Sequence, residues 1–120
     1  MKFLCLVYGE DAAMRTVDDA HCLEYDRSIR DSGHCISSEA LEPVDTAKTV
    51  RVRNGKVSFI DGPFAETKEH LAGFYMIEAR DMDEAVELAS RIPPAQVGSI
   101  EVRPIRPIRE APRPGTPRAH

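Results

Sequence analysis

The sequence predicts an α+β fold in which an antiparallel sheet carries two helices on one face. Apolar runs typical of strands alternate with helical stripes in the order strand, helix, strand, strand, helix, strand. An Asn-Gly dipeptide between two short alternating runs adds a β-hairpin to this βαββαβ pattern. The 120 residues suit one domain with one core. Because no helical segment remains to cover the second face of the sheet, we expect that face to pack against a second copy of the chain, as a homodimer.

The composition argues against several classes of protein. Apolar residues make up 42% of the chain and charged residues 30%, a balance typical of globular domains rather than disordered chains. The formal net charge of −4 provides no field that would attract nucleic acid or an anionic membrane surface. We therefore expect neither nucleic acid nor membrane as a partner.

The cysteines and the N-terminal run predict a cytoplasmic protein without a cofactor. Cys5, Cys22 and Cys35 are odd in number and include no Cys-x-x-Cys pair, which favours free thiols in a reducing compartment. The first apolar run is short for a signal peptide, and no segment approaches the ~20 apolar residues of a membrane span. No spacing of His, Cys or carboxylates predicts a metal site, and there is no glycine-rich phosphate loop.

The N-terminal part is predicted to contain a buried strand and a helix. Residues 2–8 form a nearly continuous apolar run, typical of a strand buried on both faces. Thr16 followed by Asp19 resembles a capping box, and Gly33 suits the residue after a helix, so we expect a helix between them. Residues 37–43 are predicted to be a connector with strand character only near its end.

A two-residue β-hairpin is the clearest local prediction. Residues 49–53 and 56–60 alternate in polarity around Asn54-Gly55, and Asn-Gly supplies the two positive-φ positions of a type I′ turn. The resulting register sets Val52 opposite Val57. It places four apolar side chains on one face of the hairpin: Val50, Val52, Val57 and Phe59.

The remaining elements complete the pattern. Asp61-Gly62-Pro63-Phe64 ends the hairpin, because Gly-Pro continues neither a ladder nor a helix. A second buried strand follows at residues 71–78. Asp81 then opens a helix that ends before Pro93-Pro94. The last strand is predicted at residues 99–102.

The domain is predicted to span residues 1–108. Proline and arginine dominate residues 109–120, which are predicted to be a disordered tail.

The stretch DGPFAETKEHLAGFY, residues 61–75, resembles the signature of the DGPF branch of the YCII-related family. The start MKFLCLVYG, the Asp83-Glu84-Ala85 of the second helix and the ending IEVRP at residues 100–104 are also similar to this family. The similarity covers about residues 1–105. It implies ferredoxin-like subunits that assemble as a dimeric α/β barrel.

The same resemblance implies a pocket in which a helix-borne histidine and an aspartate form an acid/base pair. The histidine matches His21, and the aspartate matches Asp61. An imidazole titrates near neutral pH and suits general acid/base catalysis. The structural alternatives are a surface histidine in a local ion pair, and an aspartate bonded to backbone N–H groups of the turn that follows it.

Other side chains are candidates for binding a substrate. Tyr8 ends a buried strand and Tyr75 lies at the centre of another, so either could line a cavity. Tyr25 shares a helical stripe with the candidate histidine and is a further candidate. Glu66, Lys68 and Glu69 form a charged cluster that could bind a polar substrate or could be an ordinary solvated face. His34 and His70 have weaker claims.

Two classes of function remain. The first is a cofactor-free lyase, isomerase or hydrolase that acts on a small organic molecule through His21 and Asp61. The second is a non-catalytic ligand sensor or protein-interaction module, such as a partner of an extracytoplasmic-function sigma factor, because some members of the family resembled occur beside or fused to such factors. An RNA-binding module is disfavoured because the predicted strands lack an aromatic and basic platform.

Overall fold

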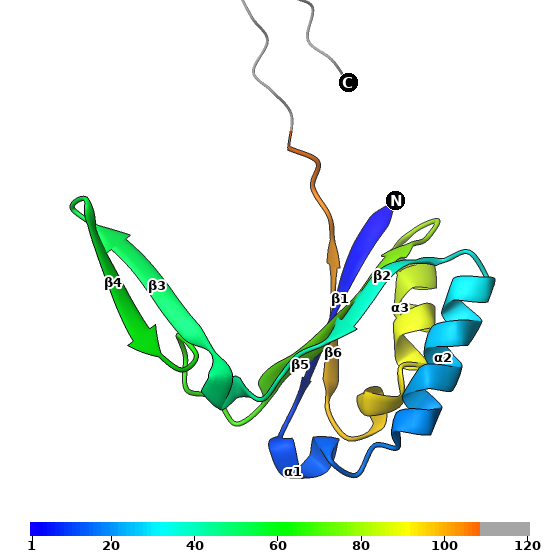
Figure 1. The fold of residues 1–120 in the computed structure, drawn as a ribbon. Helices are drawn as coiled ribbons and strands as arrows, with labels where there is room; N and C mark the ends of the chain where they lie inside the picture. Colours follow the sequence, from blue (N-terminus) through cyan, green and yellow to red (C-terminus); the bar gives the residue numbers. More distant parts are fainter. Residues whose placement is uncertain (109–120) are drawn as a thin grey trace, which may run out of the picture.

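The described chain consists of a helix-covered sheet and a separate β-hairpin (Figure 1). The computed structural model describes residues 1–108, and the predicted tail at 109–120 lies outside the described residues. The elements in chain order are β1 (Lys2–Gly9), α1 (Asp11–Met14), α2 (Asp19–Asp31), β2 (Cys35–Ala40), β3 (Lys48–Arg53), β4 (Lys56–Asp61), β5 (His70–Glu78), α3 (Met82–Ser90) and β6 (Ser99–Pro104). Short 3₁₀ turns lie at Val44–Thr46 and Pro93–Gln96.

The main sheet has four strands in the order β2-β5-β1-β6, and each neighbouring pair is antiparallel. The helices α2 and α3 lie on the same side of this sheet (Figure 1). This arrangement confirms the predicted α+β fold of ferredoxin-like type. None of the helices within residues 1–108 has the length and apolar character needed to cross a membrane.

The core lies between the sheet and the two long helices. Alternate side chains of β1 point toward the helices, so Phe3, Cys5 and Val7 are buried. Tyr75 and Ile77 of β5 lie beside them, opposite Cys5 and Phe3 in the strand register. The helices, the residue after β5 and the turn after α3 contribute the remaining side chains of the core: Ile29, Ala79, Ala85, Leu88, Ala89 and Ile92.

The first helix differs from its prediction at the N-terminus. The helix cap of α2 is Asp18, whose carboxylate accepts a hydrogen bond from the Ala20 N–H at 2.9 Å. Thr16 instead donates to the Ala13 carbonyl and closes the short helix α1, which was not predicted. The aspartate provides an acceptor at the position where free N–H groups need one, so it is the cap. Gly33 has the expected positive φ of 83°.

The segment predicted as a connector contains the strand β2. This strand pairs with β5 across the edge of the sheet, with an irregular register between Cys35 and Ser37. Its sequence CISSEA lacks a regular apolar alternation. Pairing with β5 rather than local propensity therefore determines this strand.

The hairpin has the predicted turn and register. Val50 pairs with Phe59 and Val52 with Val57, while Asn54 and Gly55 have φ values of 53° and 75°. The hairpin forms its own two-stranded sheet and projects away from the main sheet (Figure 1). We refer to residues 48–61 as the arm. All four of its valine and phenylalanine side chains are exposed.

Candidate functional site

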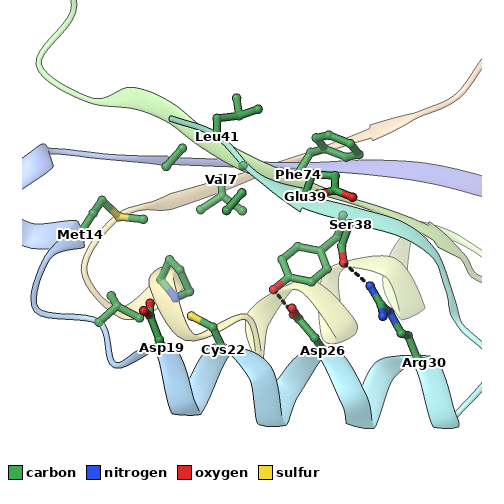
Figure 2. A pocket seen from close by; sticks show the side chains of 16 residues that line it. Val7, Met14, Asp19, Cys22, Asp26, Arg30, Ser38, Glu39, Leu41 and Phe74 are labelled. Carbon is green, nitrogen blue, oxygen red and sulfur yellow. Dashed lines mark hydrogen bonds between the residues drawn. The ribbon is translucent and has the colours of Figure 1, made fainter. Parts of the chain in front are cut away.

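A cleft of about 470 Å³ lies between α2 and the strands β2 and β5. Four side chains of α2 line it and follow one another along the helix in Figure 2: Asp19, Cys22, Asp26 and Arg30. Their spacing of three and four residues places them on one face of the helix. The apolar part of the wall comes from several elements and includes Val7, Met14, Val17, Leu41 and Pro94.

Tyr75 and Asp26 join the sheet to the helix inside the cleft. The Tyr75 hydroxyl donates a short hydrogen bond to the Asp26 carboxylate. The ring of Tyr25 meets that of Tyr75 edge to face, with centroids 5.4 Å apart. The Tyr25 hydroxyl donates to the Leu88 carbonyl at 2.9 Å. These contacts hold both phenol rings between α2, α3 and β5.

The two phenols are proton donors rather than bases. Burial raises the pKa of Tyr75 above its ordinary value, and the hydrogen bond to Asp26 raises it further because the neutral phenol is the donor. Burial also raises the pKa of Tyr25. Both hydroxyls therefore stay protonated at neutral pH, and the Asp26 carboxylate is the acceptor in the cleft.

Cys22 is not activated as a nucleophile. Burial raises the pKa of its thiol, and the nearby carboxylates Asp26, Asp19 and Asp18 raise it further. A thiol needs a positive neighbour to become a thiolate at neutral pH. The cleft is therefore suited to hydrogen bonding and proton transfer rather than to thiolate chemistry.

Arg30 and Ser38 mark one end of the cleft. The Arg30 guanidinium lies 3.5 Å from the Ser38 hydroxyl, a long contact that leaves most of its donors available (Figure 2). Asp26 lies one helical turn before Arg30, so an acceptor and a set of donors are adjacent.

The structure does not bring the predicted catalytic pair together within one chain. His21 is exposed on α2 and does not line the cleft. The Asp61 side chain is 88% exposed at the end of the arm, 3.8 Å from the Lys48 ammonium. The helix α2 and the arm lie at opposite ends of the molecule (Figure 1). The His21–Asp61 pair stays a prediction.

The predicted substrate-binding residues lie in different places. Tyr25 lies beneath the cleft, with its hydroxyl bonded to backbone. Tyr8 and Glu69 line a separate, largely apolar cavity of about 580 Å³ at the base of the arm. Lys68 lies 3.4 Å from the Glu10 carboxylate, and Glu66 is exposed. None of these predicted substrate-binding side chains lines both the cleft and the apolar cavity.

Sequence reasoning missed the polar stripe of α2. The spacing of Asp19, Cys22, Asp26 and Arg30 at three, four and four residues is visible in the sequence and could have indicated one face. The partnership of Asp26 with Tyr75 could not be found in this way, because it depends on how α2 packs on β5. Among residues 1–108, no three His, Cys, Asp or Glu side chains are grouped so as to hold a metal ion.

Comparisons with known proteins support the resemblance at the level of the YCII-related family and do not distinguish its DGPF branch. The model of the YCII-related domain matches residues 1–109. An uncharacterized protein of Rhizobium meliloti (strain 1021) is 46% identical over 67 residues, which are 54% of this chain and 54% of that protein. The aligned part of the chain thus spans about half the length of this relative. The family match covers the whole described fold, and the chain belongs to the YCII-related domain family.

Proposed function

We propose that this protein binds a small organic molecule in the cleft between α2 and the sheet. The observation that carries the proposal is the Tyr75–Asp26 hydrogen bond on the wall of a 470 Å³ cleft. Small-molecule sites typically combine apolar walls with a few polar groups that orient the ligand. The cleft has this combination, with Asp26, Ser38 and Arg30 toward one end and Met14 at the other (Figure 2).

The arrangement favours a ligand with an apolar body and a polar head. Arg30 offers hydrogen-bond donors and Asp26 offers an acceptor one helical turn away. A head that both accepts and donates, such as a carboxamide, matches this pair. The apolar body would then lie along Val7, Val17 and Leu41.

Titration with benzamide, followed by the backbone amide signals of the ¹⁵N-labelled protein, tests this proposal. We expect benzamide to shift signals of α2 and β5 residues in the cleft, and methyl benzoate, which lacks the N–H donors, to shift them less. Asp26→Ala should weaken the response to benzamide, whereas Asp31→Ala, an exposed change on the same helix, should not. Absence of any shift in the cleft with benzamide would contradict the proposal.

The same protein is proposed to be a homodimer. The outer face of the sheet carries a stripe in which Leu4 pairs with Met76 and Leu6 with Phe74. The stripe is flanked on the neighbouring strands by polar side chains: Ser37, Glu39, Glu101 and Arg103. In the described part of the chain both long helices cover the other face (Figure 1). An apolar centre with a polar rim is the typical anatomy of a protein interface.

Sedimentation equilibrium at micromolar concentration tests the dimer. We expect the wild type to sediment as a dimer and Leu6→Lys to sediment as a monomer. Val86→Lys, an exposed change on α3, should remain a dimer. A monomeric wild type would rule out this interface.

Acid/base catalysis by His21 and Asp61 would require two copies of the chain, because α2 and the arm of one copy lie apart (Figure 1). A chain with its native cysteines replaced by alanine, and with His21→Cys and Asp61→Cys, tests this arrangement. A disulfide between copies forms only if the two Cα atoms approach to about 4.4–6.8 Å. A covalent dimer on mild oxidation would support the pair, and its absence would argue against it.

The exposed face of the arm supports a second candidate function, protein interaction. Val50, Val52, Val57 and Phe59 form an apolar surface on the described chain that no other element covers. Such surfaces commonly contact proteins. An extracytoplasmic-function sigma factor is the partner proposed by family resemblance. Calorimetric titration of a purified factor with wild type and with Phe59→Lys tests this role, and absence of heat with the wild type would reject it.

A further inference from the structure

His70 occupies a joint between β1, β5 and α1. It begins β5 and pairs with Gly9, the last residue of β1. Asp11 follows two residues after Gly9 and opens α1, so the strand register brings a histidine and an aspartate together across the chain. The His70 Nδ1 atom lies 3.8 Å from the Asp11 Oδ1 atom. The ion pair between Glu10 and Lys68, at 3.4 Å, crosses the same joint.

The Nδ1 atom of His70 is buried and has no hydrogen-bond partner among the described residues. A buried polar atom left without a partner destabilises the fold, so native structures usually supply one. The Asp11 carboxylate, at 3.8 Å, is slightly beyond hydrogen-bond distance. A small movement of the Asp11 side chain, which is 58% exposed, would satisfy Nδ1–H. Catalytic hydrogen bonds are often long before a ligand binds.

Two cavities meet at His70. One, of about 650 Å³, is lined by Asp11 and continues toward the helix–sheet cleft. The other, of about 580 Å³, is lined mostly by apolar side chains that include Tyr8, Leu41, Phe64 and Leu71. His70 borders both, and its side chain is 23% exposed. A molecule in the apolar cavity would therefore lie against the imidazole, with Asp11 on the side of the other cavity.

We propose that His70, positioned by Asp11, is a general base for a small and largely apolar organic substrate held in the apolar cavity. The carboxylate accepts Nδ1–H and so leaves Nε2 with its lone pair toward the substrate. Nε2 takes a proton from a weakly acidic C–H or O–H group, and the electron pair of that bond stays on the substrate. The Asp11 carboxylate stabilises the imidazolium, which returns the proton in a later step. This chemistry is independent of ligand binding in the helix–sheet cleft.

Several charged groups face this joint; most of them line the two cavities with His70, and Glu10 and Lys68 form the ion pair that crosses the joint. They come from α1 and the residues around it, from the start of α2, from the end of β2 and from the loop before β5: Glu10, Asp11, Arg15, Asp18, Asp19, Glu42, Lys68 and Glu69. Carboxylates predominate, and Asp11 is the one within 4 Å of the ring. Asp11 is therefore the charged group whose removal should have the largest effect on which ring nitrogen of His70 carries the proton.

Proton abstraction from 5-nitrobenzisoxazole tests the proposal with a defined probe. The base removes the C3 proton, the C–H electron pair forms the nitrile, the N–O bond breaks, and a coloured phenolate leaves. We expect a rate above that of buffer and a loss of about tenfold or more in His70→Gln, since a positioned base contributes about 10²–10⁴-fold. His34→Gln, a histidine bonded to the Glu78 carbonyl, should keep the wild-type rate. A His70→Gln rate within twofold of wild type would overturn the proposal.

The ¹⁵N signals of the His70 ring show which ring nitrogen carries the proton, and they test the role of Asp11 without any substrate. We expect the neutral ring of the wild type to carry its proton on Nδ1, and Asp11→Asn to move part of it to Nε2, because a neutral amide is a weaker acceptor of Nδ1–H than a carboxylate. Asp31→Asn should leave the ring signals unchanged. Unchanged ring signals in Asp11→Asn would overturn the positioning role. Both aspartates are exposed, so these variants remain informative even where His70→Gln does not fold.

Discussion

The arm and the main sheet are both antiparallel β-structure, but they differ in what covers their apolar side chains. In the main sheet Phe3 is 0% exposed, while in the arm Phe59 is 67% exposed. The arm has the better local signals, with an Asn-Gly turn and regular alternation. Local signals therefore determine how two strands pair, and tertiary packing determines whether the pair has a core.

The comparison also bears on the candidate sites. The cleft and the His70 joint are built on the main sheet and on the helices that pack on it. Asp61, by contrast, lies at the base of an exposed hairpin, opposite Lys48. A two-stranded hairpin has little stability on its own. Side chains of the main sheet are thus held more firmly than those of the arm, which favours the former as sites for chemistry.

The largest expected difference is between core and arm phenylalanines. Phe3→Ala should lower the free energy of unfolding by about 3–5 kcal/mol, because it removes a fully buried ring and leaves a cavity. Phe59→Ala should change it by no more than about 0.5 kcal/mol. Urea unfolding under conditions in which the protein is monomeric measures both. A large effect of Phe59→Ala would mean that the arm packs against something in the same chain.

Substitutions of two glycines, one beside the main sheet and one in the arm, should have smaller effects on the free energy of unfolding. A Cβ at Gly98 would collide with the Tyr8 carbonyl oxygen, so Gly98→Ala should lower the free energy of unfolding by about 1–3 kcal/mol. Gly55 has positive φ but open space around it, so Gly55→Ala should cost about 1–2 kcal/mol within the arm. Hydrogen exchange should show faster exchange in the arm alone for Gly55→Ala. Faster exchange throughout the main sheet would contradict the separation of the two regions.

The Tyr75–Asp26 bond predicts a dependence of stability on pH in the main sheet. The unfolded chain ionises this phenol near its ordinary pKa of 10.0, whereas the folded chain keeps it protonated to higher pH. The folded state then binds more protons, so stability falls as pH rises above about 10, by up to about 1.4 kcal/mol per pH unit for one group.

This effect can be measured by urea unfolding of the wild type and of Tyr75→Phe from pH 8 to pH 11, in steps of about one pH unit. Tyr75→Phe should lower stability by about 0.5–1.5 kcal/mol at neutral pH and should show a shallower decline above pH 10. Cys5, whose pKa burial raises to about 11, contributes a decline of the same sign to both proteins. Equal slopes for the two proteins would contradict the assignment to Tyr75.

The smallest effect is expected for the exposed ion pair of the arm. Lys48→Gln should change the free energy of unfolding by less than about 0.5 kcal/mol, because an exposed pair at 3.8 Å gains little in water. Chemical denaturation at low and at high salt provides the measurement. A larger, salt-dependent loss would show that this pair holds the arm in place.

Local sequence signals were sufficient to predict several elements of the fold. Asn54-Gly55 set the hairpin register, the Gly62-Pro63 turn ended it, and the apolar run of residues 2–8 specified the first strand. These follow from backbone geometry and from side-chain periodicity within a few residues. The order of such elements was sufficient for the fold class.

Contacts between side chains that are distant in the sequence depend on how the elements pack. Strand pairing placed His70 beside Asp11, and packing of α2 on β5 placed Asp26 beside Tyr75, while Asp61 lies exposed at the base of the arm, opposite Lys48. The strand β2 likewise exists because β5 supplies its hydrogen bonds. Contacts between residues far apart in sequence depend on strand register and helix packing, and a local pattern contains neither.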